Sequence, residues 1–433
     1  MNETILGIIG LLVLLGLFLA GLELAFAMVT IGFLGFAILN NFTIAVSLLG
    51  NDFLDSLSSY SMTAIPLFVL MGQIAFNAGI AKRLYDTTHK FLGHVPGGLA
   101  MATVAGATVF KAICGSVAAT SATFASVAIP EMDRYGYSRK LSTGIVATVG
   151  TLGVLLPPSV VLIVFGIITQ QSIGKLFMAG VFPGLIMSSL FIAVIFGWCR
   201  LDPSLGPKSK AYTWPARWKS LPDVLWPIVI FLVLISGLMK GIFTPTEAGS
   251  IGAFSVLLLC VVKRDLTFKN FIQSIREAMR TSCMVLMLIA SSAVLGHFIA
   301  VTNIPQATAD WVLGVSLSRP FIMIIIFLIY LLGGSFIDDL AFMILATPIF
   351  FPIATKLGYD PLWAGIMIAC TVCIGTVIPP VAITVFVVRN ITKERMSLIY
   401  SGVYPFLISM VICMILLFIF PGIATYLPSV LMK

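Results

Sequence analysis

Charged residues are scarce in this chain of 433 residues: 10% are Asp, Glu, Lys or Arg, whereas 59% are hydrophobic. A soluble globular protein usually carries about 25% charged residues, so the composition excludes that class and indicates a polytopic membrane protein. The formal net charge of +8 does not indicate a nucleic-acid partner, because Lys and Arg cluster in short loops, as membrane orientation requires. The positive charge therefore indicates how the chain is oriented in the membrane.

The chain is also poor in the groups that enzymes and pumps use. It contains no G-x-x-x-x-G-K-[ST] phosphate loop, which argues against transport driven by ATP hydrolysis. Of three histidines, we expect His89 and His94 in a connecting loop and His297 near the outer end of a span, which supports no proton relay. Cys370 and Cys373 form a C-x-x-C within a predicted membrane helix, where small core residues are favoured over a redox or zinc site. We expect no enzyme.

Glycines and prolines recur at a fixed distance in the two halves of the chain. Residues of the first half that recur 222 positions later are Gly136, Tyr137, Gly153, Pro157, Pro158, Gly180 and Pro183, which match Gly358, Tyr359, Gly375, Pro379, Pro380, Gly402 and Pro405. The pair Gly115-Ser116 recurs as Gly334-Ser335 at an offset of 219 residues. These identities at turn-forming residues indicate an internal duplication.

Ten apolar runs are long enough to span a bilayer, which requires about 20 residues. They lie near 4–21, 24–40, 56–80, 141–170, 177–198, 224–243, 246–262, 281–302, 362–388 and 398–420. Two further runs, about 97–130 and 320–352, are too long for one span and are interrupted by Gly and Ser. Basic residues flank the first of them on both sides, so it leaves from the side that it entered and is predicted to be a re-entrant hairpin.

Each half then holds five spans and one hairpin, and the odd number of spans inverts the second half relative to the first. We therefore predict two inverted repeats, residues 1–198 and 223–433, joined by a cytoplasmic linker at 199–222. Residues 266–280 are predicted to form an interfacial amphipathic helix. Both termini are predicted to be periplasmic, and the first apolar run is expected to be retained because it lacks the basic region of a signal peptide.

The span after each hairpin contains adjacent prolines, Pro157-Pro158 in 141–170 and Pro379-Pro380 in 362–388. Adjacent prolines remove two amide donors, so both helices should break there. The freed carbonyls and nearby hydroxyls are oxygen ligands suited to Na⁺, and half-helix N-termini attract an anionic substrate. The alternative is that each proline pair only kinks its helix.

These residues resemble the large membrane subunit (M subunit) of tripartite ATP-independent periplasmic transporters over nearly the whole chain. The resemblance is most specific in Gly115 to Thr123, Ile129 to Met132, Gly136-Tyr137, Gly153 to Ser159 and Leu176 to Gly184. It implies a sodium-coupled elevator transporter of the bacterial inner membrane, with a small membrane subunit (Q subunit) and a periplasmic substrate-binding protein (P subunit) as partners. The family mostly transports small organic acids, and within it this sequence most resembles the sialic acid branch.

The hairpin tip followed by a broken helix is also similar to divalent-anion/sodium symporters. That similarity implies one Na⁺ site at Ser116, Thr120, Gly150, Thr151, Gly153 and Pro157, and a second at Gly334, Ser335, Asp338, Asp339, Thr371, Gly375, Thr376 and Pro379. It also leaves open a stand-alone symporter without a binding protein. An intramembrane enzyme is the least favoured alternative, because membrane aspartyl enzymes bring their carboxylates from separate helices.

The two halves differ in charge at the hairpin tips. Asp338 and Asp339 have no acidic counterpart in the first half, so we expect the second half to hold a cation more through formal charge. The alternative is that they cap the following half-helix, which needs no ion. Both roles can hold together.

Candidate substrate ligands are Ser116, Ser335, Lys111 and Arg389. Lys111 lies inside the first hairpin run, where a lysine must find a cavity or a partner. Arg389 follows the second broken helix and is more simply an ordinary cytoplasmic anchor. The external segments near 40–55 and 303–319 are predicted loops on which the binding protein docks.

Overall fold

The computed structural model describes residues 3–209, 211–308 and 317–432, and every regular element in these ranges is a helix. Nine of the described helical segments are long and apolar enough to cross a membrane. The predicted all-α polytopic architecture is confirmed.

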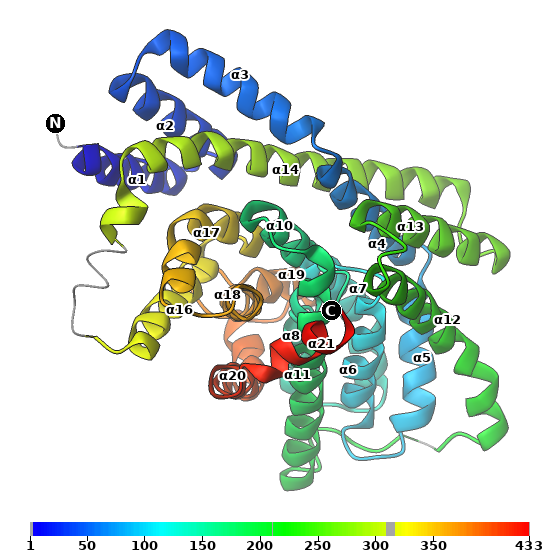
Figure 1. The fold of residues 1–433 in the computed structure, drawn as a ribbon. Helices are drawn as coiled ribbons and strands as arrows, with labels where there is room; N and C mark the ends of the chain where they lie inside the picture. The colour runs from blue at the N-terminus through cyan, green and yellow to red at the C-terminus, as the bar shows by residue number, and fades with distance from the viewer. Residues whose placement is uncertain (1–2, 210, 309–316, 433) are drawn as a thin grey trace.

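The helices form an outer layer and a central bundle (Figure 1). The outer layer consists of α1 (Glu3–Leu19), α2 (Leu24–Leu39), α3 (Phe42–Ser58), the short 3-10 helix η1 (Tyr60–Thr63), α4 (Ala64–Asn77), α12 (Trp214–Met239), α13 (Pro245–Val262) and α14 (Phe268–Val301). The central bundle consists of α6 (Gly98–Lys111), α7 (Val117–Arg134), α8 (Arg139–Val149), α9 (Leu152–Leu155), α10 (Val160–Thr169), α11 (Ile173–Leu201), α16 (Arg319–Phe336), α17 (Asp339–Lys356), α18 (Pro361–Gly375), α19 (Ile383–Thr392), α20 (Met396–Ile419) and α21 (Gly422–Leu431). Helix α5 (Ile80–Leu92) connects the two parts and packs on both α6 and α12.

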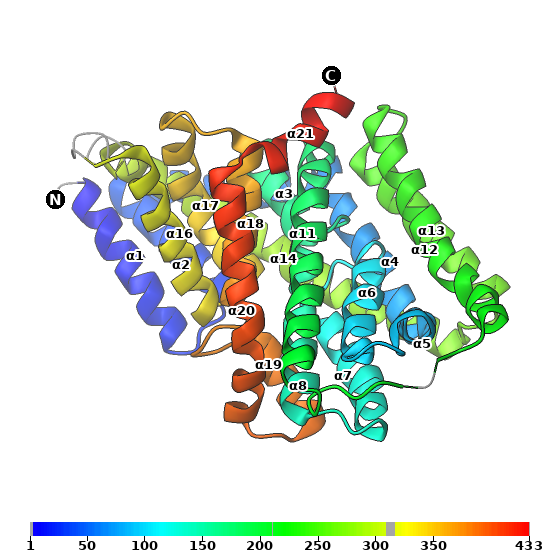
Figure 2. The same ribbon diagram turned by 90° about the horizontal axis from the view of Figure 1, so that it is seen from below.

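Each half of the chain contributes the same succession of elements to the bundle. A helix pair (α6–α7 or α16–α17) precedes an interrupted helix (α8–α10 or α18–α19), and a long helix (α11 or α20) follows. In Figure 2 the α7–α8 connection lies at the lower edge and the α17–α18 connection at the upper edge. The two helix pairs therefore enter the bundle from opposite sides, in the positions of the predicted hairpins 97–130 and 320–352.

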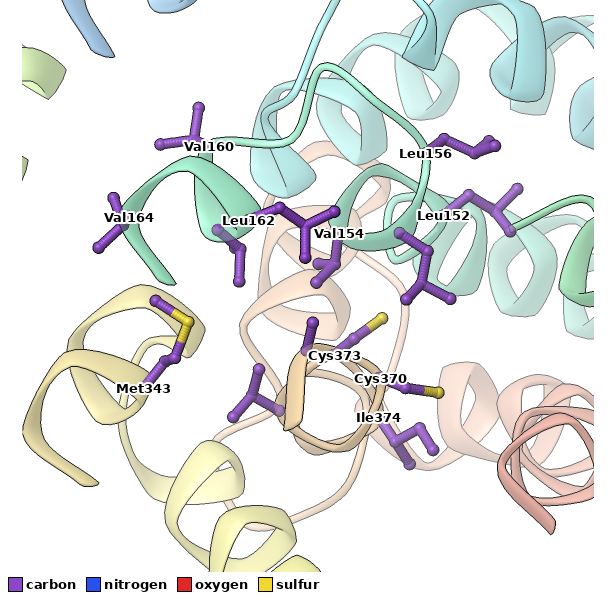
Figure 3. Close-up of a cluster of buried hydrophobic side chains, with 14 of the residues drawn as sticks. Leu152, Val154, Leu156, Val160, Leu162, Val164, Met343, Cys370, Cys373 and Ile374 are labelled. Carbon is purple, nitrogen blue, oxygen red and sulfur yellow. The ribbon is translucent and has the colours of Figure 1, made fainter. Parts of the chain in front are cut away.

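The two interrupted helices meet in the apolar core of the bundle. Figure 3 shows apolar side chains of the first interrupted helix, including Leu152 and Leu162, packed near Cys373 and Ile374 of α18. Cys370 and Cys373 are both fully buried, and the Cys373 thiol donates a hydrogen bond to the Thr151 carbonyl oxygen at 3.1 Å. The C-x-x-C pair is thus part of this core.

Helix α14 runs along the whole outer layer and packs against α2, α3 and α4. Its contact with α4 is polar: the Asn77 amide donates to Ser274 Oγ and to Glu277 Oε2, both at 3.1 Å. Such hydrogen bonds between helices hold membrane proteins together where the hydrophobic effect does not. Because α14 is continuous, the predicted separate amphipathic helix at 266–280 is its first half, and the predicted span 281–302 is the rest.

Three other local predictions differ from the structure. The segment 40–55, predicted as a loop, lies mostly in α3, whose Asn41 cap accepts a hydrogen bond from the Thr43 amide at 2.8 Å. His89, also predicted in a loop, lies in α5, where its ring edge packs against Tyr135. The predicted linker 199–222 is shorter, since α11 extends to Leu201 and α12 begins at Trp214. Residues 309–316 of the predicted loop 303–319 lie outside the described residues.

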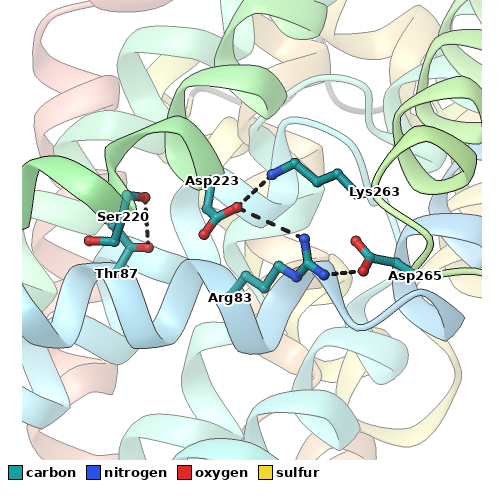
Figure 4. A network of polar contacts seen from close by, with 6 residues as sticks. All are labelled: Arg83, Thr87, Ser220, Asp223, Lys263 and Asp265. Carbon is teal, nitrogen blue, oxygen red and sulfur yellow. Dashed lines mark hydrogen bonds and ion pairs between the residues drawn. The ribbon is translucent and has the colours of Figure 1, made fainter. Parts of the chain in front are cut away.

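Ion pairs fasten α5 to α12 and to the segment that follows α13 (Figure 4). Arg83 of α5 pairs with Asp265, and its second nitrogen lies 4.0 Å from Asp223. Lys263 joins this network of ion pairs, with its Nζ 2.5 Å from Asp223 Oδ1. In addition, Thr87 Oγ1 donates a hydrogen bond to the Ser220 carbonyl oxygen at 3.1 Å. Ion pairs therefore hold the connecting helix to the outer layer, while its other side packs on α6.

The contact between α8 and α20 generates a test of the fold. A Cβ on Gly144 would lie within 2.6 Å of Gly402 backbone atoms, and a Cβ on Gly402 would collide with the Lys140 carbonyl oxygen. We expect Gly144→Val and Gly402→Val each to destabilise the protein by about 1–3 kcal/mol, the usual cost of overpacking. The midpoint of thermal unfolding in detergent, followed by tryptophan fluorescence, measures this. Gly197→Val on α11 is the control, because nothing lies within 4 Å of its added Cβ, and an equal loss there would refute the helix-crossing explanation.

Candidate functional site

A cavity of about 240 Å³ lies between the outer layer and the central bundle. On the layer side, Phe68, Gln73, Thr281 and Met284 of α4 and α14 line it. On the bundle side, it is lined by Cys114, Gly115, Ser116, Val117, Ala118, Val160, Val161, Asp338, Asp339, Leu340, Thr376 and Ile383. The cavity is therefore the place where both helix-pair tips and both interrupted helices meet the layer.

Four helices of the bundle begin at this cavity. The first residues of α7, α10, α17 and α19, which are Val117, Val160, Asp339 and Ile383, all line it. A helix N-terminus carries unpaired amide groups and about half a positive charge, so such ends attract anions. The convergence of four N-termini makes the bundle wall of the cavity favourable for a negatively charged group.

Among the described residues of the lining, the carboxylates are Asp338 and Asp339, both at the N-terminus of α17. Asp338 is the N-cap of α17, and its Oδ1 accepts a hydrogen bond from the Leu340 amide at 3.2 Å. Asp339 follows in the first turn and is 6% exposed. None of the described residues that line the cavity is Lys or Arg. The predicted capping role of Asp338 is thus present in the structure. The charge of the two carboxylates is not paired with a basic side chain of the described lining, and a cation bound between them and Thr376 would neutralise it.

The structure brings each helix-pair tip against the break of its own interrupted helix. In the second half, the Val381 amide donates to the Ser335 carbonyl oxygen at 3.1 Å, and a Cβ on Gly375 would lie 2.6 Å from the Gly334 carbonyl carbon. In the first half, a Cβ on Gly115 would lie 2.7 Å from the Pro158 carbonyl oxygen. Only glycines allow the tips to approach the breaks this closely.

The residues predicted for the first ion site gather around the α7 N-terminus but do not all reach the cavity. Ser116 lines it, and its carbonyl oxygen accepts a hydrogen bond from Thr120 Oγ1 at 2.9 Å. Thr151 Oγ1 donates to the Thr148 carbonyl oxygen at 2.6 Å. The rest of the predicted set is buried behind the tip: Gly150, Gly153 and Pro157.

The predicted second site is divided in the same way. Asp338, Asp339 and Thr376 line the cavity, whereas Gly334, Ser335, Thr371 and Gly375 are buried beside it. Thr371 Oγ1 donates to the Met367 carbonyl oxygen at 2.7 Å, within its own helix. Pro379 is exposed, unlike Pro157, so the second break is more open than the first.

The two predicted basic substrate ligands lie away from the cavity lining. Arg389 is exposed in the last turn of α19, at the far end of that helix from the cavity. Lys111 is fully buried behind the first tip, with its Nζ donating to the Ser116 carbonyl oxygen at 2.7 Å. Sequence reasoning missed the residues of the outer layer. Gln73 and Thr281, polar residues within apolar helices, were the available signal.

The family model described as "Tripartite ATP-independent periplasmic transporter, DctM component" matches residues 11–423. The chain is 34% identical over 373 residues to the C4-dicarboxylate TRAP transporter large permease protein DctM of Pseudomonas aeruginosa, covering 86% of each chain. It is 29% identical over 417 residues to the sialic acid TRAP transporter large permease protein SiaM of Vibrio cholerae, covering 96% of each. It is also 30% identical over 396 residues to the 2,3-diketo-L-gulonate TRAP transporter large permease protein YiaN of Escherichia coli, covering 91% of this chain and 92% of that protein.

Among solved structures, the fold is similar to the YdaH transporter of Alcanivorax borkumensis, with a TM-score of 0.59 and 12% sequence identity over 88% of this chain and 89% of that one. At this identity the likeness concerns the fold alone. The family match spans both halves, with their helix pairs and interrupted helices, and three relatives of nearly the same length are large permease proteins. The chain belongs to the tripartite ATP-independent periplasmic (TRAP) transporter family, as its DctM component, the large membrane subunit.

Proposed function

We propose that this protein imports a small organic acid across the bacterial inner membrane by sodium-coupled secondary transport, with both termini on the periplasmic side. The observation that carries the proposal is the convergence of four helix N-termini on one cavity, with two carboxylates at one of them. Helix N-termini suit the carboxylate of an organic acid. The Asp pair suits a cation that enters with it.

The proposed substrate is an organic anion, and N-acetylneuraminate (sialic acid) is the first candidate. The relative from Vibrio cholerae, whose name specifies sialic acid, aligns over 96% of this chain. The relative from Pseudomonas aeruginosa, whose name specifies C4-dicarboxylates, has the higher identity of 34% over a shorter region. A C4-dicarboxylate is therefore the necessary comparison in every uptake experiment.

The proposed sodium ion of the second half binds between the α17 tip and the break after α18. Asp338, Asp339 and Thr376 offer oxygen atoms there, and Gly334 lets the two backbone segments approach. Each ionised Asp at mid-membrane costs about 2.5–3.5 kcal/mol, which a bound cation offsets. The first half has a related arrangement of tip and break around the Ser116 carbonyl oxygen.

Coupling follows if Na⁺ orders the α17 tip and so completes the anion site beside it. Each ligand then raises the affinity of the protein for the other. For the transport step we propose an elevator movement, in which the central bundle carries the cavity past the outer layer. The cavity lies at the boundary between these two parts, which supports that division of roles.

We propose that the protein works with a periplasmic substrate-binding protein and a small membrane subunit, the partners that the family implies. The proposed docking surface for the binding protein is the segment 40–55, which includes most of α3, together with the segment 303–319. The alternative is a stand-alone sodium symporter, which the following experiment separates from the proposal.

Uptake of labelled sialic acid or succinate into proteoliposomes tests the proposed function. We expect sialic acid to accumulate only with an inward Na⁺ gradient and only when the small subunit and the binding protein are both present. Uptake of succinate instead would keep the mechanism and change the substrate. Sodium-driven uptake by this chain alone would establish the stand-alone symporter. Uptake that is indifferent to Na⁺ would refute the proposed coupling.

The Asp pair can be tested separately from the capping role of Asp338. Asparagine retains a cap oxygen but removes the charge, so we expect Asp338→Asn and Asp339→Asn to raise the Na⁺ concentration for half-maximal uptake at least about tenfold, equivalent to about 1.4 kcal/mol. Asp338→Ala should in addition lower the stability of the Na⁺-free protein by about 0.5–2 kcal/mol. Sodium titrations of uptake and thermal unfolding in Na⁺-free detergent measure the two effects.

Asp360 provides a matched control for this test. It caps α18 through hydrogen bonds from the Leu362 amide at 2.8 Å and the Trp363 amide at 3.0 Å, but it is exposed and does not line the cavity. Asp360→Asn should leave the sodium dependence unchanged. An unchanged sodium dependence in both Asp338→Asn and Asp339→Asn would reduce the pair to a helix cap.

A further inference from the structure

Lys111 is a charged residue that the proposed transport cycle has not yet used. It is the last residue of α6, lies at the tip of the first helix pair and is 0% exposed. Its Nζ donates to the Ser116 carbonyl oxygen at 2.7 Å, the same oxygen that accepts from Thr120 Oγ1 at 2.9 Å. A lysine at this depth in a membrane protein is costly unless it is paired or functional.

Within the described residues, no carboxylate pairs directly with this ammonium group. None of the ion pairs within 4.0 Å in the described ranges includes Lys111. Asp339 of α17 interacts with it electrostatically from a longer distance. The ammonium is therefore held by a backbone carbonyl oxygen, by the negative C-terminal end of α6 and by a distant carboxylate.

The position of the ammonium coincides with the predicted first ion site. A Cβ on Gly153, at the break of the first interrupted helix, would collide with Nζ, Cε and Cδ of Lys111. The group thus fills the space between the α7 tip and the break, among Ser116, Thr120 and Gly153. A second positive charge in the same space would be strongly repelled, because the interior screens charge poorly.

The equivalent position of the second half carries no basic residue. At the repeat offset of 219 residues, the position of Lys111 is taken by Tyr330, whose hydroxyl donates to Thr347 Oγ1 at 3.3 Å. That half instead carries Asp338 and Asp339 at its tip. The first tip therefore has a basic residue and no acid in its sequence, whereas the second tip has two acids and no basic residue.

We propose that the Lys111 ammonium replaces a sodium ion in the first half, so that Na⁺ binds at the second tip and not between the first tip and its break. The tethered ammonium holds Ser116 and Gly153 together in every state of the cycle. The second tip depends on Na⁺ for the same contact. The inference rests on the proposed sodium coupling and specifies its stoichiometry.

The test counts sodium ions in the complete transporter, with the small subunit and the binding protein present. Lys111→Met removes the charge and retains an apolar chain of similar length, so a Na⁺ site should open. We expect the Hill coefficient for Na⁺ and the number of Na⁺ ions per substrate, measured from reversal potentials, each to rise by about one. Lys111→Arg keeps the charge and should retain the wild-type numbers, as should Lys175→Met at an exposed position of α11.

Each outcome decides between the two proposals. Sodium-dependent wild-type uptake with an unchanged ion number in Lys111→Met overturns the role of Lys111 and leaves the proposed function intact. Wild-type uptake without sodium dependence overturns both. Should Lys111→Met fail to fold or transport, cryo-electron microscopy of the wild-type complex with Tl⁺ in place of Na⁺ decides: density at the second tip alone is expected, and density beside Ser116 overturns the inference.

Discussion

The architecture depends on one constraint: helices that are interrupted in the membrane interior must find partners for their freed backbone groups. An unsatisfied group there costs several kcal/mol. The two breaks and the two helix-pair tips solve this together, as in the hydrogen bond from the Val381 amide to the Ser335 carbonyl oxygen and that from the Cys373 thiol to the Thr151 carbonyl oxygen. When the tips pack against the breaks to form these hydrogen bonds, the N-termini of α7, α10, α17 and α19 come together. The cavity lies where these four N-termini meet.

The two halves use the same backbone arrangement with different chemistry. Prolines and glycines at equivalent positions give each half a tip and a break, whereas the charged residues differ: Lys111 stands behind the first tip, and Asp338 and Asp339 stand at the second. In the proposed cycle, the two halves thereby use cations of different origin, the Lys111 ammonium in the first half and Na⁺ in the second. This asymmetry links the sequence repeat to the proposed ion coupling, because only the second half must obtain its cation from solution.

Different polar interactions stabilise the outer layer itself and attach the connecting helix to it. Within the layer, the amide of Asn77 joins α4 to α14 through Ser274 and Glu277. Between the parts, the connecting helix α5 is fastened by Arg83 to Asp223 and Asp265. The cavity lies where the bundle faces α4 and α14, and Gln73 and Thr281 contribute the layer's polar groups to its lining. In the proposed elevator movement, the bundle residues of the lining would therefore travel with the cavity, and only the residues contributed by the outer layer would change.

The sequence by itself determined the class, the duplication and the positions of the breaks, because apolar length, charge in loops and paired prolines are local features. It also identified Ser116, Asp338, Asp339 and Thr376, which line the cavity. It did not predict that residues 42–58 form helix α3 or that α14 is continuous. It also did not predict that Phe68, Gln73, Thr281 and Met284 line the cavity. Only the tertiary structure decided that Lys111 lies against Gly153 while Arg389 lies apart from the site, because contacts between distant segments depend on how the two halves pack and leave no periodic signal in either one.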